Sequence, residues 1–156
     1  MIIGFKGEKS KLEKLYKELG LQPISVKSLD DILDKIKSND GKTVIDNYNE
    51  FMVFSDPTAD LVEKRNDVLA AVKKAKNNLF ITLGSDDKSL DKLILDIKIA
   101  TTVKTKDMNE IEDLFYFLNT DIAYNGTLSD DDYVVKLHSD ERGSKKSIAE
   151  IKRLIK

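Results

Sequence analysis

The amino acids that this chain lacks exclude several classes of chemistry. Among its 156 residues there is no cysteine, and His138 is its one histidine. Without cysteine the chain forms no disulfide, no cysteine–zinc site and no thiol nucleophile. A single histidine excludes a multi-histidine metal centre and leaves little room for a Ser-His-Asp triad. We interpret His138, which follows an expected strand, as a surface or interface residue.

Excess charge and long hydrophobic runs are lacking as well. The 26 Lys and Arg side chains nearly balance the 28 Asp and Glu side chains, which gives a net charge of −2 and no global field that attracts nucleic acid or anionic membrane. No apolar run approaches the ~20 residues that span a bilayer. Met1 runs directly into an expected strand, so we expect no signal peptide, no membrane association and a cytoplasmic location.

Hydrophobic periodicity and turn residues predict alternating strands and helices. The expected strands are 1–3, 24–26, 43–46, 79–83, 97–103 and 133–137. The expected helices are 10–19, 29–40, 60–76, 89–95, 107–118 and 147–155. Ser10 and Glu13 form a capping box for the first helix, Ser28 and Asp31 cap the second, and 47–59 is expected to be a loop.

Five strand–helix units in succession predict an α/β fold. We expect a three-layer α/β/α domain with a mainly parallel five-strand sheet that helices cover on both faces. The whole chain, 1–156, is then one domain with a core over 1–118, a polar loop over 119–132 and a C-terminal strand–helix addition over 133–156.

The first ten residues contain the most informative motif. Gly4 and Gly7 follow an apolar run, and Lys9 and Ser10 precede a helix, which is the layout of a phosphate-binding loop. Glycines expose backbone N–H groups, and a helix N-terminus and a lysine add positive charge. The loop is one residue shorter than the full pattern, and Glu8 stands where a glycine is usual.

Over roughly residues 1–118 the chain therefore resembles a minimal, degenerate P-loop domain of the RecA-like type. The resemblance implies ATP and Mg²⁺ as ligands. Gly4, Gly7 and Lys9 would then cradle phosphate, and Ser10 and Asp46 would hold the metal ion. In the structural alternative, the two glycines form a tight turn, Ser10 caps a helix and Lys9 is a solvated surface charge.

The same resemblance implies sensor and catalytic positions. Thr82 or Ser85, at the end of the expected strand 79–83, would be the polar sensor. Asn47 stands where many such ATPases have a catalytic glutamate, with Glu50 as its substitute, and Arg142 would act in trans on a neighbour's nucleotide. These departures from the family pattern favour a non-hydrolysing or weakly nucleotide-binding protein. The resemblance implies that it is a subunit in DNA replication, recombination or packaging, which acts with a protein partner or as a homo-oligomer.

A second reading is a receiver-like signalling domain. Asp46, Thr82 and Lys104 follow the order of the receiver's phosphoacceptor, hydroxyl and lysine positions. No acidic pair follows Ile3 to hold Mg²⁺, so this reading predicts a pseudo-receiver that binds partners without phosphorylation. In both families the strand that lies between the first strand and the Asp46 strand in the sequence does not lie between them in the sheet. The shape of the 4–10 loop should therefore discriminate between the two families better than the strand order does.

A third reading is an interaction module without chemistry. Basic residues cluster near the C-terminus, and Lys145, Lys152, Arg153 and Lys156 would form a polar face along the expected C-terminal helix. Such a face either binds nucleic-acid phosphates without reading sequence or is simply solvated. The cluster consists of Arg142, Lys145, Lys146, Lys152, Arg153 and Lys156. Acidic pairs at 30–31 and 86–87 and the run 130–132 are compatible with a metal-dependent nuclease, but we interpret them in preference as helix-cap and loop residues.

Overall fold

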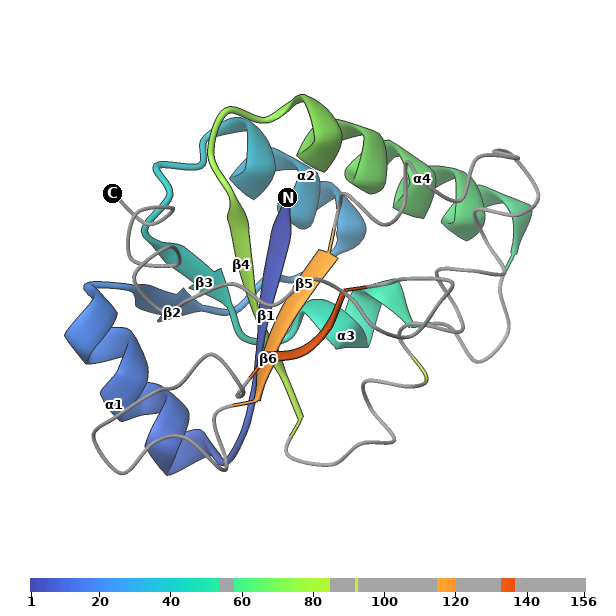
Figure 1. Cartoon of the computed structure of the whole chain (residues 1–156). Coiled ribbons are helices and arrows are strands. Elements are labelled where there is room, and N and C mark those ends of the chain that lie inside the picture. Colours follow the sequence, from blue (N-terminus) through green and yellow to red (C-terminus); the bar gives the residue numbers. More distant parts are fainter. Residues whose placement is uncertain (54–57, 85–91, 93–114, 120–132, 137–156) are drawn as a thin grey trace.

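The computed structural model describes residues 1–53, 58–84, 92, 115–119 and 133–136, the last two segments as backbone (Figure 1). Six strands form one sheet in the order β2-β3-β4-β1-β5-β6. The strands are β1 (Ile2–Lys6), β2 (Gln22–Ile24), β3 (Thr43–Ile45), β4 (Leu79–Leu83), β5 (Phe115–Asn119) and β6 (Tyr133–Lys136). The helices are α1 (Lys9–Leu19), α2 (Leu29–Lys37), α3 (Tyr48–Met52) and α4 (Ala59–Lys74).

The sheet is parallel except at one edge. β1 lies between β4 and β5 and is parallel to both, and β2, β3 and β4 continue the parallel pairing on one side. β6 pairs antiparallel with β5 and so extends the same sheet. The predicted α/β class with a mainly parallel sheet is confirmed. The predicted five-strand set is not, because its fifth member, 97–103, lies outside the described residues.

Several segments differ from the predicted elements, and β2 covers Gln22–Ile24 where the strand was predicted at 24–26. Phe115–Asn119 is a strand, although a helix was predicted up to residue 118. The sequence Phe-Tyr-Phe-Leu is a short apolar run that suits a buried strand as well as a helix end, and periodicity does not separate the two. Residues 48–52 form α3 where a loop was predicted. The predicted helix 147–155 lies outside the described residues, as does all of 89–95 except Lys92.

Helices cover the two faces of the sheet, and alternation along β1 separates two cores (Figure 1). Ile3 and Phe5 pack with Leu12 and Leu15 of α1 on one face. Ile2 belongs to the opposite core, which is formed with residues of α2, α3 and α4. Successive strand residues point to opposite faces, so the continuous run Ile2–Lys6 is buried on both sides.

The boundaries of α1 differ from those predicted. β1 continues through Gly4 to Lys6, so the apolar run does not break at the glycine. Glu8 is the N-cap of α1 and makes no side-chain capping bond, which contradicts the predicted Ser10–Glu13 capping box. Gly20 ends the helix in the left-handed conformation with φ of 71°, as a C-terminal glycine is expected to do.

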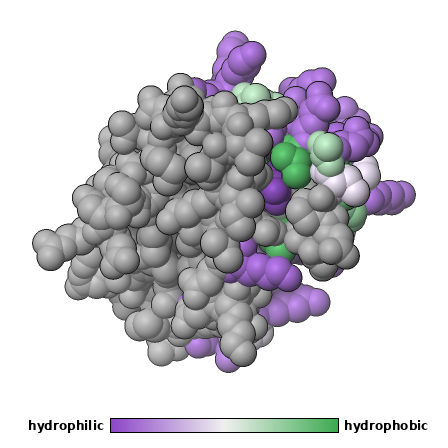
Figure 2. Space-filling view, turned by 90° about the vertical axis from the view of Figure 1, so that its right-hand side faces the viewer, coloured by the Kyte–Doolittle hydropathy of each residue, from purple (hydrophilic) through white to green (hydrophobic). Residues whose placement is uncertain are grey.

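The caps of α2 and α4 follow the sequence signals. The Ser28 hydroxyl accepts a hydrogen bond from the Asp31 backbone N–H at 3.0 Å, which confirms that predicted cap. The Thr58 hydroxyl accepts one from the Leu61 N–H in the same way. None of the described helices has the length and hydrophobicity to cross a bilayer. On the face shown in Figure 2, the visible described side chains are mostly hydrophilic, with a few hydrophobic ones between them.

Candidate functional site

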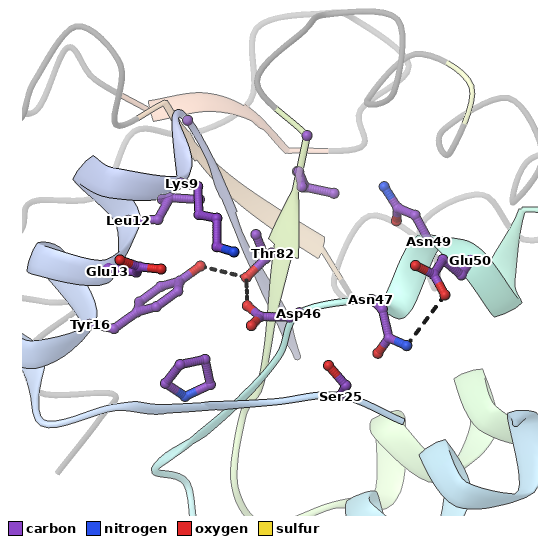
Figure 3. A pocket seen from close by; sticks show the side chains of 14 residues that line it. Lys9, Leu12, Glu13, Tyr16, Ser25, Asp46, Asn47, Asn49, Glu50 and Thr82 are labelled. Atoms are coloured by element: carbon purple, nitrogen blue, oxygen red, sulfur yellow. Dashed lines mark hydrogen bonds between the residues drawn. The ribbon is translucent and has the colours of Figure 1, made fainter. Parts of the chain in front are cut away.

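A cleft of about 640 Å³ lies at the carboxyl ends of the central strands, between α1 on one side and α3 on the other (Figure 3). Parallel α/β sheets bind ligands at this edge, where neighbouring strands lead to helices on opposite faces. Four segments line the cleft. Its lining residues are Gly7, Lys9, Leu12, Glu13, Tyr16, Pro23, Ser25, Asp46, Asn47, Asn49, Glu50, Thr82, Leu83 and Gly84.

Three side chains in the cleft form a continuous chain of hydrogen bonds. The Tyr16 hydroxyl lies 2.7 Å from the Thr82 hydroxyl oxygen. Thr82 donates to the Asp46 carboxylate oxygen Oδ1 at 2.8 Å. The chain joins α1, β4 and the residue that follows β3, so it connects three elements that are distant in sequence (Figure 3).

Tyr16 is held on two sides. Its ring packs edge-to-face on Phe5, with centroids 5.3 Å apart, and the residue is only 2 % exposed. Burial raises the pKa of the Tyr16 phenol far above its usual value, and the charge of Asp46 raises it further. The phenol is therefore neutral and serves as a hydrogen-bonding group at ordinary pH.

The charges around the cleft are mainly negative. Lys9 is the cation among the lining residues, and Glu13, Asp46 and Glu50 are the anions. Within the described part of the chain, the Lys9 ammonium makes no hydrogen bond or ion pair, and its side chain extends toward Thr82 and Tyr16 (Figure 3). An unpaired cation beside a carboxylate can receive an anionic group and a divalent cation together.

Asn47 has a structural task at the edge of the cleft. Its side-chain oxygen accepts from the Val26 N–H at 2.8 Å, and its NH₂ donates to the Val26 carbonyl at 2.7 Å. The NH₂ also lies 3.5 Å from a Glu50 carboxylate oxygen. Asn47 therefore ties the segment after β2 to the segment after β3, and its amide oxygen is occupied by the backbone.

The connection between β1 and α1 is shorter than a phosphate-binding loop. Only Gly7 and Glu8 lie between the end of the strand and the first helical residue. Among the described glycines, positive φ angles occur at Gly20 and Gly41 and not at Gly4 or Gly7. A two-residue connection without these angles does not form the nest of backbone N–H groups that wraps a phosphate.

The structure brings five of the predicted site residues to one cleft. These residues are Gly7, Lys9, Asp46, Glu50 and Thr82. Gly4 is buried in the middle of β1, opposite Ile81, and Ser10 is exposed on the first turn of α1 and does not line the cleft. Ser85, Lys104, Arg142 and the basic C-terminal cluster lie outside the described residues.

Sequence reasoning missed Tyr16 and Glu13 as members of the site. Tyr16 was assigned to the apolar face of the first helix, where its ring does pack. A buried tyrosine hydroxyl usually requires a partner, and this was the signal that the helix also faces a polar site. The sequence alone did not identify Thr82 as that partner.

The described residues include no group of three or more Asp, Glu, His or Cys side chains that would hold a metal ion by themselves. Mg²⁺ commonly binds through one or two carboxylates and the oxygens of a phosphate ligand. Asp46 can supply one such carboxylate, since only its Oδ1 takes part in hydrogen bonds among the described residues.

Comparisons of the chain with protein-family models, with curated proteins and with solved structures find no significant match.

Proposed function

We propose that this protein is a degenerate RecA-like P-loop protein whose cleft binds a nucleotide together with Mg²⁺ weakly or without hydrolysis. The observation that carries the proposal is the meeting of Lys9, Asp46 and Thr82 at the carboxyl ends of β1, β3 and β4. Lys9 would neutralise phosphate, and Asp46 would contact the metal ion that accompanies it.

The strand order supports this reading over the receiver-like one. The resemblance to a RecA-like domain implies that the fourth strand in the sequence lies between the first and the third in the sheet, and that the fifth lies on the other side of the first. The observed order β3-β4-β1-β5 has this arrangement. A receiver has the order 2-1-3-4-5, in which the first strand contacts the third. The strand order is therefore one argument for the RecA-like reading, although we expected from the sequence that loop shape would discriminate better than topology.

The short β1–α1 connection is the reason that we propose weak binding and inefficient hydrolysis. Two residues between strand and helix leave fewer backbone donors for a β-phosphate than a complete loop provides. Hydrolysis also requires a group that orients water, and the Glu50 carboxylate lies toward Asn47 in Figure 3. A role as a subunit of a DNA replication, recombination or packaging assembly follows from the family resemblance.

Thermal unfolding with and without millimolar Mg²⁺–ATP tests the proposal. A ligand at about a hundred times its Kd stabilises a protein by about 2.7 kcal/mol, which raises Tm by about 5–10 °C for a chain of this size. We expect such a shift in the native protein and in Lys14→Ala, which removes an exposed α1 lysine outside the cleft. We expect it to be lost in Lys9→Ala.

Two results would contradict the proposal. The first is the absence of a Tm shift with ATP, GTP and the deoxynucleotides, which would favour a protein-interaction module without catalysis. The second is a shift that Lys9→Ala and Lys14→Ala reduce equally, which would place the ligand elsewhere. Measurement of released phosphate in the same samples would then compare binding with hydrolysis.

A further inference from the structure

The direction of the hydrogen bonds in the Tyr16–Thr82–Asp46 chain follows from proton counting. A threonine hydroxyl has one proton, and an ionised carboxylate only accepts. Thr82 gives its proton to Asp46 Oδ1 at 2.8 Å, so the 2.7 Å contact with Tyr16 is a bond in which the phenol donates. Each proton in the chain thus points toward Asp46.

This direction changes the role expected of Thr82. The Thr82 hydroxyl proton is already bonded to Asp46, so Thr82 does not donate to a ligand phosphate while this hydrogen bond is intact. The hydrogen bonds from Tyr16 to Thr82 and from Thr82 to Asp46 orient the Asp46 carboxylate. The Asp46 backbone N–H also donates to the Ile24 carbonyl at 2.8 Å, which holds the main chain of the same residue.

We propose that Tyr16 is a positioning residue for a divalent cation in the cleft, and that it acts through Thr82 on the Asp46 carboxylate. Tyr16 orients the Thr82 hydroxyl, Thr82 holds Oδ1, and the other carboxylate oxygen faces the cation. Groups that hydrogen-bond to a metal ligand and orient it commonly change the metal affinity by about 10-fold or more. The inference deepens the proposed function and rests on it for the accompanying nucleotide.

The packing of Tyr16 makes this role testable by a small substitution. The ring is buried against Phe5, so Tyr16→Phe keeps the packed ring and removes only the hydroxyl. Thr82→Val removes the middle of the chain with little change in volume, and Thr82→Ser restores a hydroxyl at that position. Tyr48→Phe is the matched control, because Tyr48 is buried in the opposite core and does not line the cleft.

The experiment measures cation and nucleotide binding separately. Mn²⁺ binding with and without ATP is followed by electron paramagnetic resonance, and ATP binding by calorimetry in Mg²⁺ and in EDTA. We expect Tyr16→Phe and Thr82→Val to weaken Mn²⁺ binding by about 10-fold, and to weaken ATP binding in Mg²⁺ but not in EDTA. We expect the native affinity in Thr82→Ser and Tyr48→Phe.

The remaining outcomes separate this inference from the proposed function. Equal Mn²⁺ affinity in the native protein and Tyr16→Phe would overturn the inference, whatever happens with ATP. Mn²⁺ binding that depends on Tyr16, without any ATP binding, would overturn the proposed function and support the inference. If the native protein binds no Mn²⁺, either with or without ATP, the inference is overturned. In that case, ATP binding in EDTA that is lost in Lys9→Ala would still support a phosphate site.

Discussion

Tyr16 and Tyr48 lie on opposite faces of the sheet, and their rings are almost equally buried, but their hydroxyls have different surroundings. The Tyr16 hydroxyl is bonded to Thr82 and, through it, to Asp46 in the cleft. The Tyr48 residue is 0 % exposed, and its hydroxyl has no hydrogen-bond partner among the described residues. Burial raises the pKa of both phenols, and for Tyr48 the charge of Arg65 offsets part of that rise.

The different surroundings of the two hydroxyls show that polar groups have different roles on the two faces of the sheet. On the α1 face a buried phenol connects the core to the cleft, so packing there also orients the Asp46 carboxylate through Thr82. On the face of α2, α3 and α4, Arg65 donates to the Met52 carbonyl at 2.9 Å and helps to hold α3 against α4. Polar groups on this second face stabilise the arrangement of helices, and we expect substitutions there to change stability without changing binding.

The largest expected effect comes from removing an aromatic ring beneath the site. Phe80 is fully buried on the α1 face and stacks on Phe5 with centroids 6.0 Å apart. We expect Phe80→Ala to lower the free energy of unfolding by about 3–5 kcal/mol, measured by urea denaturation. Ile81→Val, on the opposite face of the same strand, should lower it by about 0.5–1.5 kcal/mol. A loss below about 1 kcal/mol in Phe80→Ala would show that α1 does not pack on the sheet as described.

Alkaline pH should destabilise the protein through both tyrosines. Their folded-state pKa values are raised, whereas the ordinary tyrosine pKa is 10.0, so above pH 10 the unfolded chain releases protons that the folded protein retains. Stability is therefore complete below pH 10 and falls as the pH rises, by about 1.4 kcal/mol per pH unit for each tyrosine. Urea denaturation between pH 9 and 11.5 measures this slope.

The variants Tyr16→Phe and Tyr48→Phe separate the contributions of the two tyrosines to the slope of the free energy of unfolding against pH. Each should reduce the decline by the contribution of one tyrosine, and the double variant should remove both contributions. Lysines that titrate in the same range are common to all four proteins, so differences between the slopes isolate the phenols. Identical slopes in the native protein and Tyr48→Phe would mean that the Tyr48 phenol ionises in the folded state as readily as in water.

Local sequence signals predicted much of the fold because their physical causes are local. The capping hydroxyl of Ser28, the left-handed Gly20 and the apolar runs of β3 and β4 depend on neighbouring residues, and each was recognised. The Phe115–Asn119 strand was missed because a short apolar run satisfies both periodicities, and its pairing with β1 is a contact between distant segments.

Some residues of the candidate cleft could be predicted from the sequence, and others could not. Asp46 and Thr82 were identified because residues at the ends of parallel strands share one edge of the sheet. Gly4 was misplaced because its neighbours Ile3 and Phe5 are both buried, which extends the strand through the glycine. Tyr16 was missed because its ring obeys the helix pattern, and its hydroxyl finds a partner 66 residues away.

The Tyr48 hydroxyl should contribute little to stability at neutral pH. A buried polar group without a partner carries a desolvation cost, so its removal is neutral or stabilising. We expect Tyr48→Phe to change the free energy of unfolding by between zero and a gain of about 1 kcal/mol, and Tyr16→Phe to lose about 0.5–1.5 kcal/mol. Urea denaturation at pH 7 compares them. A larger loss in Tyr48→Phe than in Tyr16→Phe would reverse the contrast between the two faces.

The smallest effect is expected at the ion pair between α2 and α4. The Lys64 ammonium lies 3.4 Å from an Asp30 carboxylate oxygen, and their side chains are 44 % and 72 % exposed. Water screens such a pair, so Lys64→Ala should cost about 0.2–1 kcal/mol in low salt, and the cost should fall further in 0.5 M NaCl. Urea denaturation at both salt concentrations measures this, with Lys14→Ala as the control for loss of an exposed lysine. A cost above about 2 kcal/mol that persists in salt would show that this surface holds α2 to α4 and that the polar contacts of the second face are not confined to its core.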